Sequence, residues 1–454
     1  MAVVPNDLET DRQPPMTIPL RHFVVALAFL AAGGLLGVGV ATGAASGLAT
    51  LAHVHLLLAG WVCITIMGAM TQFVPVWSAV ALHSRRLAAV QLWLVAGGLA
   101  GFATALLGGW VVLLPVFGGA MLLGFWTFVY NVGRSLAAVD DPDVTERHFA
   151  VALGFFLLVT LLGFLLALDL AVPFLGRVSV SRVALLRAHA TLAVFGAVLT
   201  TVLGALYQLG TMFTQTELHG VDRPLRRLEE AVYPLGVLLL ATGRLLNWGA
   251  LATVGAAFVL AGVLAFSAVL ARKLVETRVA WTPMLARYAV VPPAMALWAL
   301  LTAPAWLRDP LPVGVLFGGP GTVHLLVIGV VGFVVLGTLY HVVPFIVWVH
   351  RYSDRIGYEQ IPMIDDLYDA GIAWVDFGCF LGGGALIVAA DWASLDPRVS
   401  AAGGALFLVG VALFAWNLLG VIREHSPHSL VGLLVPRLAA GGDAATGADD
   451  SVTE

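Results

Sequence analysis

The chain has 454 residues, of which 60% are hydrophobic and 11% charged, and its mean hydropathy is +0.95. This composition excludes an ordinary soluble globular domain and indicates a polytopic membrane protein. The formal net charge of -4 gives no basic excess, so nothing in the sequence indicates nucleic-acid binding.

Twelve apolar stretches follow one another along the chain. Each has about 20 residues, the length that crosses a bilayer as an α-helix. They lie at 22–44, 51–77, 87–107, 109–133, 148–173, 185–213, 231–247, 250–272, 286–306, 322–348, 368–390 and 400–422. The sequence therefore predicts an all-α polytopic membrane protein with twelve transmembrane helices in residues 22–425. Residues 1–21 are predicted to be a cytoplasmic leader, and the small, acidic residues 438–454 a disordered tail.

The second, sixth and tenth stretches share a pattern of histidine and glycine. The matching residues are His53, Gly60 and Gly68 in the second stretch and His189, Gly196 and Gly204 in the sixth; in the tenth, Gly329 and Gly337 match these glycines and His324 matches His55. Gly204 comes 136 residues after Gly68, Gly337 comes 133 residues after Gly204, and each interval holds four stretches. This internal repeat predicts three pseudo-symmetric four-helix arcs, at about 22–133, 148–272 and 286–422.

Arginine marks one side of the predicted bundle. The residues are Arg85, Arg86, Arg134, Arg147, Arg223, Arg226, Arg227, Arg272, Arg278, Arg351 and Arg355, with Lys273, the one lysine of the chain. Because cytoplasmic loops carry the excess of positive charge, this side is predicted to be cytoplasmic. The N-terminus would then lie in the cytoplasm and the protein in a prokaryotic cell membrane. The histidines of the repeat would lie in the outer third of the bilayer.

A matched set of histidines inside membrane spans indicates a ligand role, because an unbonded imidazole there costs free energy. His53 and His55 are two residues apart on a helix, roughly 200° around its axis, so they are expected to face different sites. His189 and His324 lie at matching depth on other arcs, and paired imidazoles from facing helices bind haem or a transition metal. The glycines seven and fifteen residues after His53 leave flat patches that admit either a porphyrin or a neighbouring helix.

Other polar residues in the spans have two interpretations each. Arg187 and Arg244 lie at the depth of the histidines and are candidate partners of haem propionates, although outer-loop arginines also reach towards the interface. Asp376 belongs either to a proton path or to a hydrogen-bonded structural group. His22 and His148 open the first spans of two arcs and are interpreted as interface anchors.

The second stretch carries a recognisable motif. It reads His-Val-His at 53–55, Gly-Trp-Val at 60–62, Gly-Ala-Met at 68–70 and Val-Pro at 74–75. This motif resembles the tenth-helix signature of subunit I of the C-type (cbb) haem-copper oxidases. That superfamily has twelve core helices in three arcs, an inside N-terminus and haems near the outer face. The resemblance implies that His53 binds the active-site haem and that His55 binds the low-spin haem.

The motif lies on the second span here and on the tenth span in the family. If positions are kept, the low-spin haem is held by His324 with His55 or His53, which is the pairing we favour. If the arcs are permuted, it is held by His55 with His189. The seventh span, 231–247, has none of the histidines that the family uses for copper or non-haem iron. A complete binuclear centre, and with it proton-pumping oxygen reduction, is therefore not expected.

We expect a membrane protein that binds haem b and serves in electron transfer or in binding O2 or NO, with copper left open as a further metal. No Cys-x-x-Cys-His attachment site for covalent haem is present. The number of spans and the scattered histidines are also similar to the NnrS-type haem-copper membrane proteins. The expected partners are membrane lipid and an electron donor such as a cytochrome or cupredoxin.

Two alternative functions remain. One is the catalytic subunit of a terminal oxidase or nitric oxide reductase, which would make the protein an oxidoreductase. The other is a multi-span transporter built of three repeats, which explains the symmetry but not the matched histidines.

Overall fold

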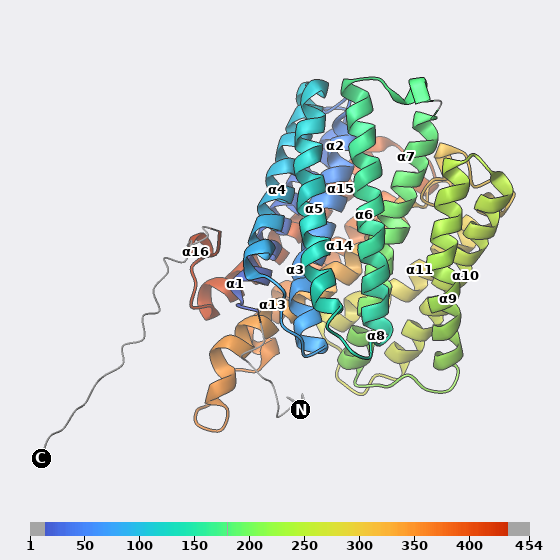
Figure 1. Cartoon of the computed structure of the whole chain (residues 1–454). Helices are drawn as coiled ribbons and strands as arrows, with labels where there is room; N and C mark the ends of the chain where they lie inside the picture. Colours follow the sequence, from blue (N-terminus) through green and yellow to red (C-terminus); the bar gives the residue numbers. More distant parts are fainter. Residues whose placement is uncertain (1–13, 179, 435–454) are drawn as a thin grey trace, which may run out of the picture.

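The computed structural model describes residues 14–178 and 180–434 of the chain. Within these residues all regular structure is helical, and eleven helices are long and apolar enough to cross a membrane. They stand side by side as a bundle (Figure 1). The prediction of an all-α polytopic membrane protein is confirmed. The predicted tail 438–454 and residues 1–13 of the predicted leader lie outside the described residues.

The helices follow the predicted order. The first third of the chain has α1 (Thr17–Ala41), α2 (Ala49–His55), η2 (Leu56–Cys63), α3 (Ile64–Trp77), α4 (Arg85–Gly108), η3 (Val111–Leu113) and α5 (Leu114–Leu136). The middle third has α6 (Val144–Ala171), η4 (Leu175–Val178), α7 (Arg182–Thr191), η5 (Leu192–Leu199), α8 (Thr200–Thr214), α9 (Asp222–Leu245) and α10 (Gly249–Val275). The last third has α11 (Pro283–Arg308), η6 (Val313–Val315), α12 (Val323–Leu326), η7 (Val327–Gly332), α13 (Phe333–Tyr352), η8 (Ser353–Arg355), η9 (Ile364–Leu367), α14 (Ala370–Trp392), α15 (Pro397–His425) and α16 (Leu430–Leu434).

Among the long helices of the described residues, α9 is the one that does not belong to the eleven apolar helices. It contains the predicted seventh span, 231–247, and packs against α10. Six of its seven charged residues lie in its first nine positions and lower its hydropathy; these six are Asp222, Arg223, Arg226, Arg227, Glu229 and Glu230. Part of α9 is therefore polar, whereas its second half from Ala231 is almost wholly apolar.

Three long helices, which we call the central helices, form the inside of the bundle. Each is continuous through a π-helical segment: α2–η2–α3, α7–η5–α8 and α12–η7–α13. Their most apolar windows are 67%, 89% and 78% buried, more than those of the other eight apolar helices. Each π segment begins a few residues after a histidine of the repeat. Single π-helical turns inside α-helices are frequent at functional sites, because they change the facing of side chains on either side.

Equivalent glycines of the central helices make equivalent contacts. A Cβ on Gly68 would lie 2.6 Å from the Cβ of His22 in α1, and one on Gly204 would lie 2.4 Å from the Cβ of His148 in α6. A Cβ on Gly337 would lie 3.3 Å from the Cβ of Arg287 in α11. The glycines therefore let the first helix of each third pack closely on a central helix.

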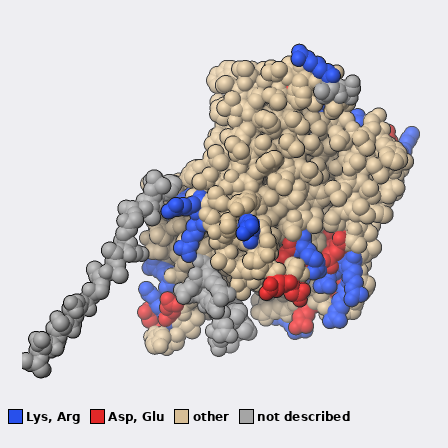
Figure 2. All heavy atoms as spheres, viewed as in Figure 1, with Lys and Arg blue, Asp and Glu red and all other residues tan. Residues whose placement is uncertain are grey.

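Charged side chains gather at the end of the bundle where α8 ends and α9 begins, and the broad tan area above them on the visible face shows none (Figure 2). Large apolar residues are exposed on the outer helices, including Leu35, Val116, Leu123 and Leu300. An exposed apolar surface of this extent is suited to lipid, not to water. The molecule is therefore a multi-pass membrane protein.

Candidate functional site

The four predicted histidine ligands lie at the starts of the central helices. His53 and His55 are in α2, His189 is in α7 and His324 is in α12. His53 is within electrostatic range of His324, and His55 is within electrostatic range of His189. Since residues two apart on a helix point in nearly opposite directions, α2 presents one imidazole to each of the other two central helices. The structure thus brings His55 and His189 together at one cavity and places His53 within long-range electrostatic reach of His324.

The ring nitrogens of these histidines share one arrangement. Nδ1 contacts the carbonyl oxygen of Gly33 at 2.7 Å in His53, that of Leu51 at 2.8 Å in His55 and that of Val159 at 2.9 Å in His189. In His324 it contacts the carboxylate of Asp391. Because a carbonyl oxygen only accepts, the hydrogen-bond network assigns the proton to Nδ1. Among the described residues none of the four Nε2 atoms has a hydrogen-bond partner, so each neutral ring has a free lone pair.

Metal-bound histidines almost always have this arrangement, in which the nitrogen that does not bind the metal donates to a carbonyl or carboxylate. The anchor fixes both the tautomer and the direction of the ring. Four histidines anchored in this way therefore fit the donor set that haem iron or a transition metal takes.

His55 and His189 line a common cavity of about 460 Å³. Its walls come from α2, η2, α4, α5, α6, α7 and η5, and they are mostly apolar, with Phe102, Phe125 and Phe156 among the lining residues. Cavities of about 300–1,000 Å³ with apolar walls and a few polar groups are typical of ligand and cofactor sites. The lining residues whose side chains can bind a metal include His55, His189 and Cys63.

The glycines that follow His53 do not open a flat patch for a porphyrin. A Cβ on Gly60 would lie 2.7 Å from Phe29, and Gly68 is covered by His22. Of the two interpretations of these glycines, the neighbouring helix is the one that applies. The helical glycines on the cavity wall are instead Gly118 of α5 and Gly163 of α6.

Arg244 is fully buried and is held by the protein itself. Its guanidinium donates to the carbonyl oxygens of Pro310, Val315 and Leu316 and to Oγ1 of Thr191, and it lies over the ring of Trp306. It fixes the segment before α12 against the end of α7. Arg244 does not line the cavity of His55 and His189, so a contact with a propionate stays a prediction.

Arg187 lies on α7, two residues before His189. Its Nη1 donates to Oδ1 of Asn247 at 3.0 Å, and its buried Nε has no hydrogen-bond partner. The side chain lines a second cavity of about 760 Å³ with Leu165, Phe174 and other residues. This arrangement does not test the predicted contact of Arg187 with a haem propionate.

Asp391 is a residue of the site that sequence reasoning missed. It is the second-last residue of α14 and pairs with Nδ1 of His324. The predicted eleventh span ended at residue 390, so Asp391 was assigned to a loop. An acid at the histidine end of a membrane helix was the available signal, because such an acid needs a partner.

Asp376 lies deeper in α14 and is fully buried. It forms an ion pair with Arg287 of α11 and accepts a hydrogen bond from the hydroxyl of Tyr340, which in turn accepts one from Nδ2 of Asn417 at 3.2 Å. These contacts agree with the interpretation as a hydrogen-bonded structural acid. The interpretation as interface anchors is wrong for His22 and His148, which are only 1% and 3% exposed.

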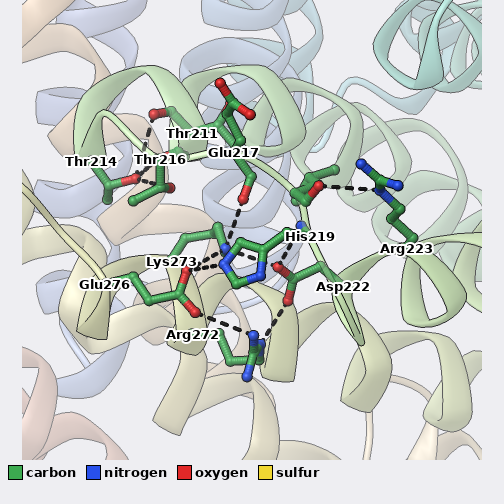
Figure 3. Close-up of polar contacts among 12 residues, drawn as sticks. Thr211, Thr214, Thr216, Glu217, His219, Asp222, Arg223, Arg272, Lys273 and Glu276 are labelled. Carbon is green, nitrogen blue, oxygen red and sulfur yellow. Dashed lines mark hydrogen bonds and ion pairs between the residues drawn. The ribbon is translucent and has the colours of Figure 1, made fainter.

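A group of His219, Asp222 and Glu276 has ligand atoms within 4.8 Å of one another at the charged end of the bundle (Figure 3). Nζ of Lys273 lies 2.8 Å from Asp222 and 2.6 Å from Glu276, and Arg272 also contacts both acids. The hydrogen bond from Lys273 has the largest effect on Glu276 and, with that from His219, holds the pKa of its carboxyl below the usual value. The positive charge that a metal would supply is already present, so we assign these residues as an ion-pair cluster.

No protein-family model matches the chain, and no curated protein matches it either. The functional argument therefore depends on the histidine geometry.

Proposed function

We propose that the chain is a haem-binding multi-pass membrane protein, related to the haem-copper oxidases, that carries electrons or binds a diatomic gas such as O2 or NO. The observation that supports this most is the pair His55 and His189, which line one apolar cavity and whose rings are each anchored through Nδ1, leaving Nε2 without a protein hydrogen bond. No protein hydrogen bond occupies these atoms, and a haem iron takes two such donors.

The proposed architecture is twelve spans in three four-helix arcs, with α9 as the seventh span. The packing of α9 against α10 and the equivalent glycine contacts support it. We also propose that the N-terminus faces the cytoplasm and that the membrane is that of a prokaryotic cell; the arginine-rich loops on that side of the twelve-span arrangement support the orientation.

His55 and His189 are the proposed ligands of haem b, which is the permuted one of the two pairings that the sequence left open. When bound, the haem iron supplies a one-electron couple. The residues of the chain orient the two imidazoles through Leu51 and Val159, and the apolar wall excludes water. A dry wall of this kind also controls the redox potential of a bound iron.

His53 and His324 form the second proposed metal site, for haem iron or copper. Its carboxylate partner, Asp391, makes it unlike the first site, where both anchors are backbone carbonyls. Helix α9 supplies no histidine, so we do not propose a complete binuclear centre. An electron donor such as a cytochrome or cupredoxin would act from the outer face.

The test is a reduced-minus-oxidised visible spectrum of the protein purified from haem-sufficient cells, with iron and copper counted per chain. The expected result is the spectrum of b-type haem and at least one iron per chain. Colourless, iron-free protein would contradict the proposal and would favour the transporter alternative.

A further inference from the structure

Two buried polar clusters occupy equivalent places at the charged end of the bundle. The histidine cluster consists of His148 in α6, Glu229 in α9 and Tyr207 in α8, which are 3%, 0% and 4% exposed. The arginine cluster consists of Arg287 in α11, Asp376 in α14 and Tyr340 in α13, also buried. In each cluster a carboxylate of an outer helix joins a basic residue to a tyrosine of a central helix.

The basic residues correspond in detail. His148 packs against Gly204 and Arg287 packs against Gly337, which are equivalent glycines of the repeat. Nδ1 of His148 contacts the carbonyl oxygen of Val144 at 2.7 Å, and Nη1 of Arg287 donates to that of Pro283 at 2.6 Å. Both acceptors come four residues earlier in the chain.

The hydrogen bonds of the histidine cluster decide where its protons lie. The carbonyl of Val144 only accepts, so Nδ1 of His148 always carries a proton. Nε2 is 3.1 Å from Oε1 of Glu229, and the Tyr207 hydroxyl donates to Oε2 of the same carboxylate at 2.9 Å. The hydrogen bond between Nε2 and Oε1 therefore contains one proton, which lies on either atom. In both cases His148 and Glu229 together have no net charge.

The histidine cluster can also bind a second proton. If Oε2 of Glu229 takes it up, the carboxylic acid donates to the Tyr207 oxygen after the hydroxyl has rotated, and His148 remains an imidazolium. In this arrangement Nε2 of His148 still donates to Oε1, while the Tyr207 oxygen accepts from Oε2 and gives up its own donation. The arginine cluster has no such freedom, because a guanidinium does not release its proton in a protein and holds Asp376 as a carboxylate.

On α6 and on α9, the residue next to a member of the histidine cluster in the sequence is exposed or partly exposed. Arg147, beside His148, is 48% exposed and forms an ion pair with Glu230, the residue beside Glu229. The other charged or titratable groups that face the cluster are Arg226 and Tyr233 of α9. The cluster therefore lies close to charged, partly exposed residues at this end of the bundle.

Polar groups continue from the cluster towards the cavity of His189. Tyr233, one turn after Glu229 on α9, donates to the carbonyl oxygen of Phe195 at 2.6 Å. Phe195 belongs to η5, and its neighbours Val194 and Ala197 line that cavity. Tyr233 therefore joins α9, the helix that carries Glu229, to the central helix through a hydrogen bond.

We propose that His148, Glu229 and Tyr207 form a proton-binding site that exchanges protons with the aqueous phase at the charged end of the bundle, whereas Arg287, Asp376 and Tyr340 form a fixed ion pair. Ionisable residues inside a membrane protein most often mark ion or proton pathways. This inference does not depend on haem, because neither cluster includes a proposed ligand.

The test is a pH-difference infrared spectrum of the protein reconstituted in lipid vesicles. Between roughly pH 8 and pH 5, the range in which histidine-linked groups titrate, a carboxylic acid signal should grow in the wild type. Glu229→Gln should abolish it, and its amide can still accept from Tyr207 and donate to a neutral His148, so the variant keeps the hydrogen bonds. Asp376→Asn is the matched control and should leave the signal in place.

A reciprocal exchange guards against loss of folding in one variant. His148→Arg copies the arginine cluster and should abolish the signal, while Arg287→His copies the histidine cluster and should add a second signal from Asp376. The proposal is overturned if the wild type gives no signal, if the signal persists in Glu229→Gln or His148→Arg, or if Asp376→Asn removes it.

Discussion

Single hydrogen bonds decide which nitrogen of each histidine is available. In three of the four candidate ligands a backbone carbonyl holds Nδ1, and in His324 a carboxylate does so. A carboxylate partner makes an imidazole a stronger donor than a carbonyl does, because it stabilises positive charge on the ring. The pair of His53 and His324 should therefore bind a metal differently from the pair of His55 and His189.

Replacing Asp391 by asparagine tests this difference. The amide oxygen still accepts from Nδ1, so the ring keeps its place but is a weaker donor. Loss of such a partner typically weakens metal binding about 10- to 100-fold, and we expect this at the site of His53 and His324 alone. The measurement is a titration of metal-free protein with haem, iron or copper.

Asp396→Asn is the control, since Asp396 caps α15 near the same end of α14 and contacts no histidine in the described part of the chain. Equal effects of the two variants, or an effect of Asp391→Asn on the cavity of His55 and His189, would count against the assignment.

Residue types and spacing led to the prediction that the four histidines are ligands. They did not predict which groups hydrogen-bond the Nδ1 atoms. The two-residue spacing of His53 and His55 predicted correctly that they face different helices, because helix geometry requires it. The partners of Nδ1 could not be predicted, since Gly33 and Val159 act through backbone atoms that have no sequence signal. Asp391 lay one residue outside its predicted span, and boundaries are the least certain part of such a prediction.

At the level of helices, the π-helical segments and the glycines position the rings. A π turn adds a residue to the helix turn, so side chains before and after η5 are rotated relative to an unbroken α-helix. Apolar runs have the same composition in either form, so the sequence did not indicate these segments. Gly163 of α6 lies against the ring of His189, where a Cβ would be 2.8 Å from Cε1.

Gly163→Ala is therefore expected to turn the ring of His189 away from its present direction. Overpacking of a tight site typically costs about 1–3 kcal/mol, and here the ring is the part that can move. A haem held by His189 should become partly high-spin or bind more weakly, as its visible spectrum would report.

Gly118→Ala offers a matched comparison on the same cavity wall. A Cβ there would be 3.5 Å from Ala167, an ordinary contact, so this variant should keep the wild-type spectrum. If both variants behaved alike, the ring of His189 would not be what the substitution moves.

For the whole molecule, composition and run length were enough to predict a helical membrane protein, whereas the central position of the three histidine-bearing helices was learned from the structure. Helix α9 shows the limit of that reasoning. Its charged first turns reduce its hydropathy, and only the structure places them in buried or ion-paired positions such as that of Glu229. The proposed haem binding requires that histidines from different thirds of the chain lie close together, as His55 and His189 do at their cavity.

The most direct test of that claim is the reduced-minus-oxidised spectrum of His189→Ala beside those of His324→Ala and His341→Ala. His189→Ala should convert the low-spin haem signal to a high-spin one or remove it, because one of the two proposed ligands is gone. His324→Ala should retain the low-spin signal. So should His341→Ala, since His341 lies about 25 Å further along the same central helix at 1.5 Å per residue. A low-spin signal that survives in His189→Ala and disappears in His324→Ala would contradict the account.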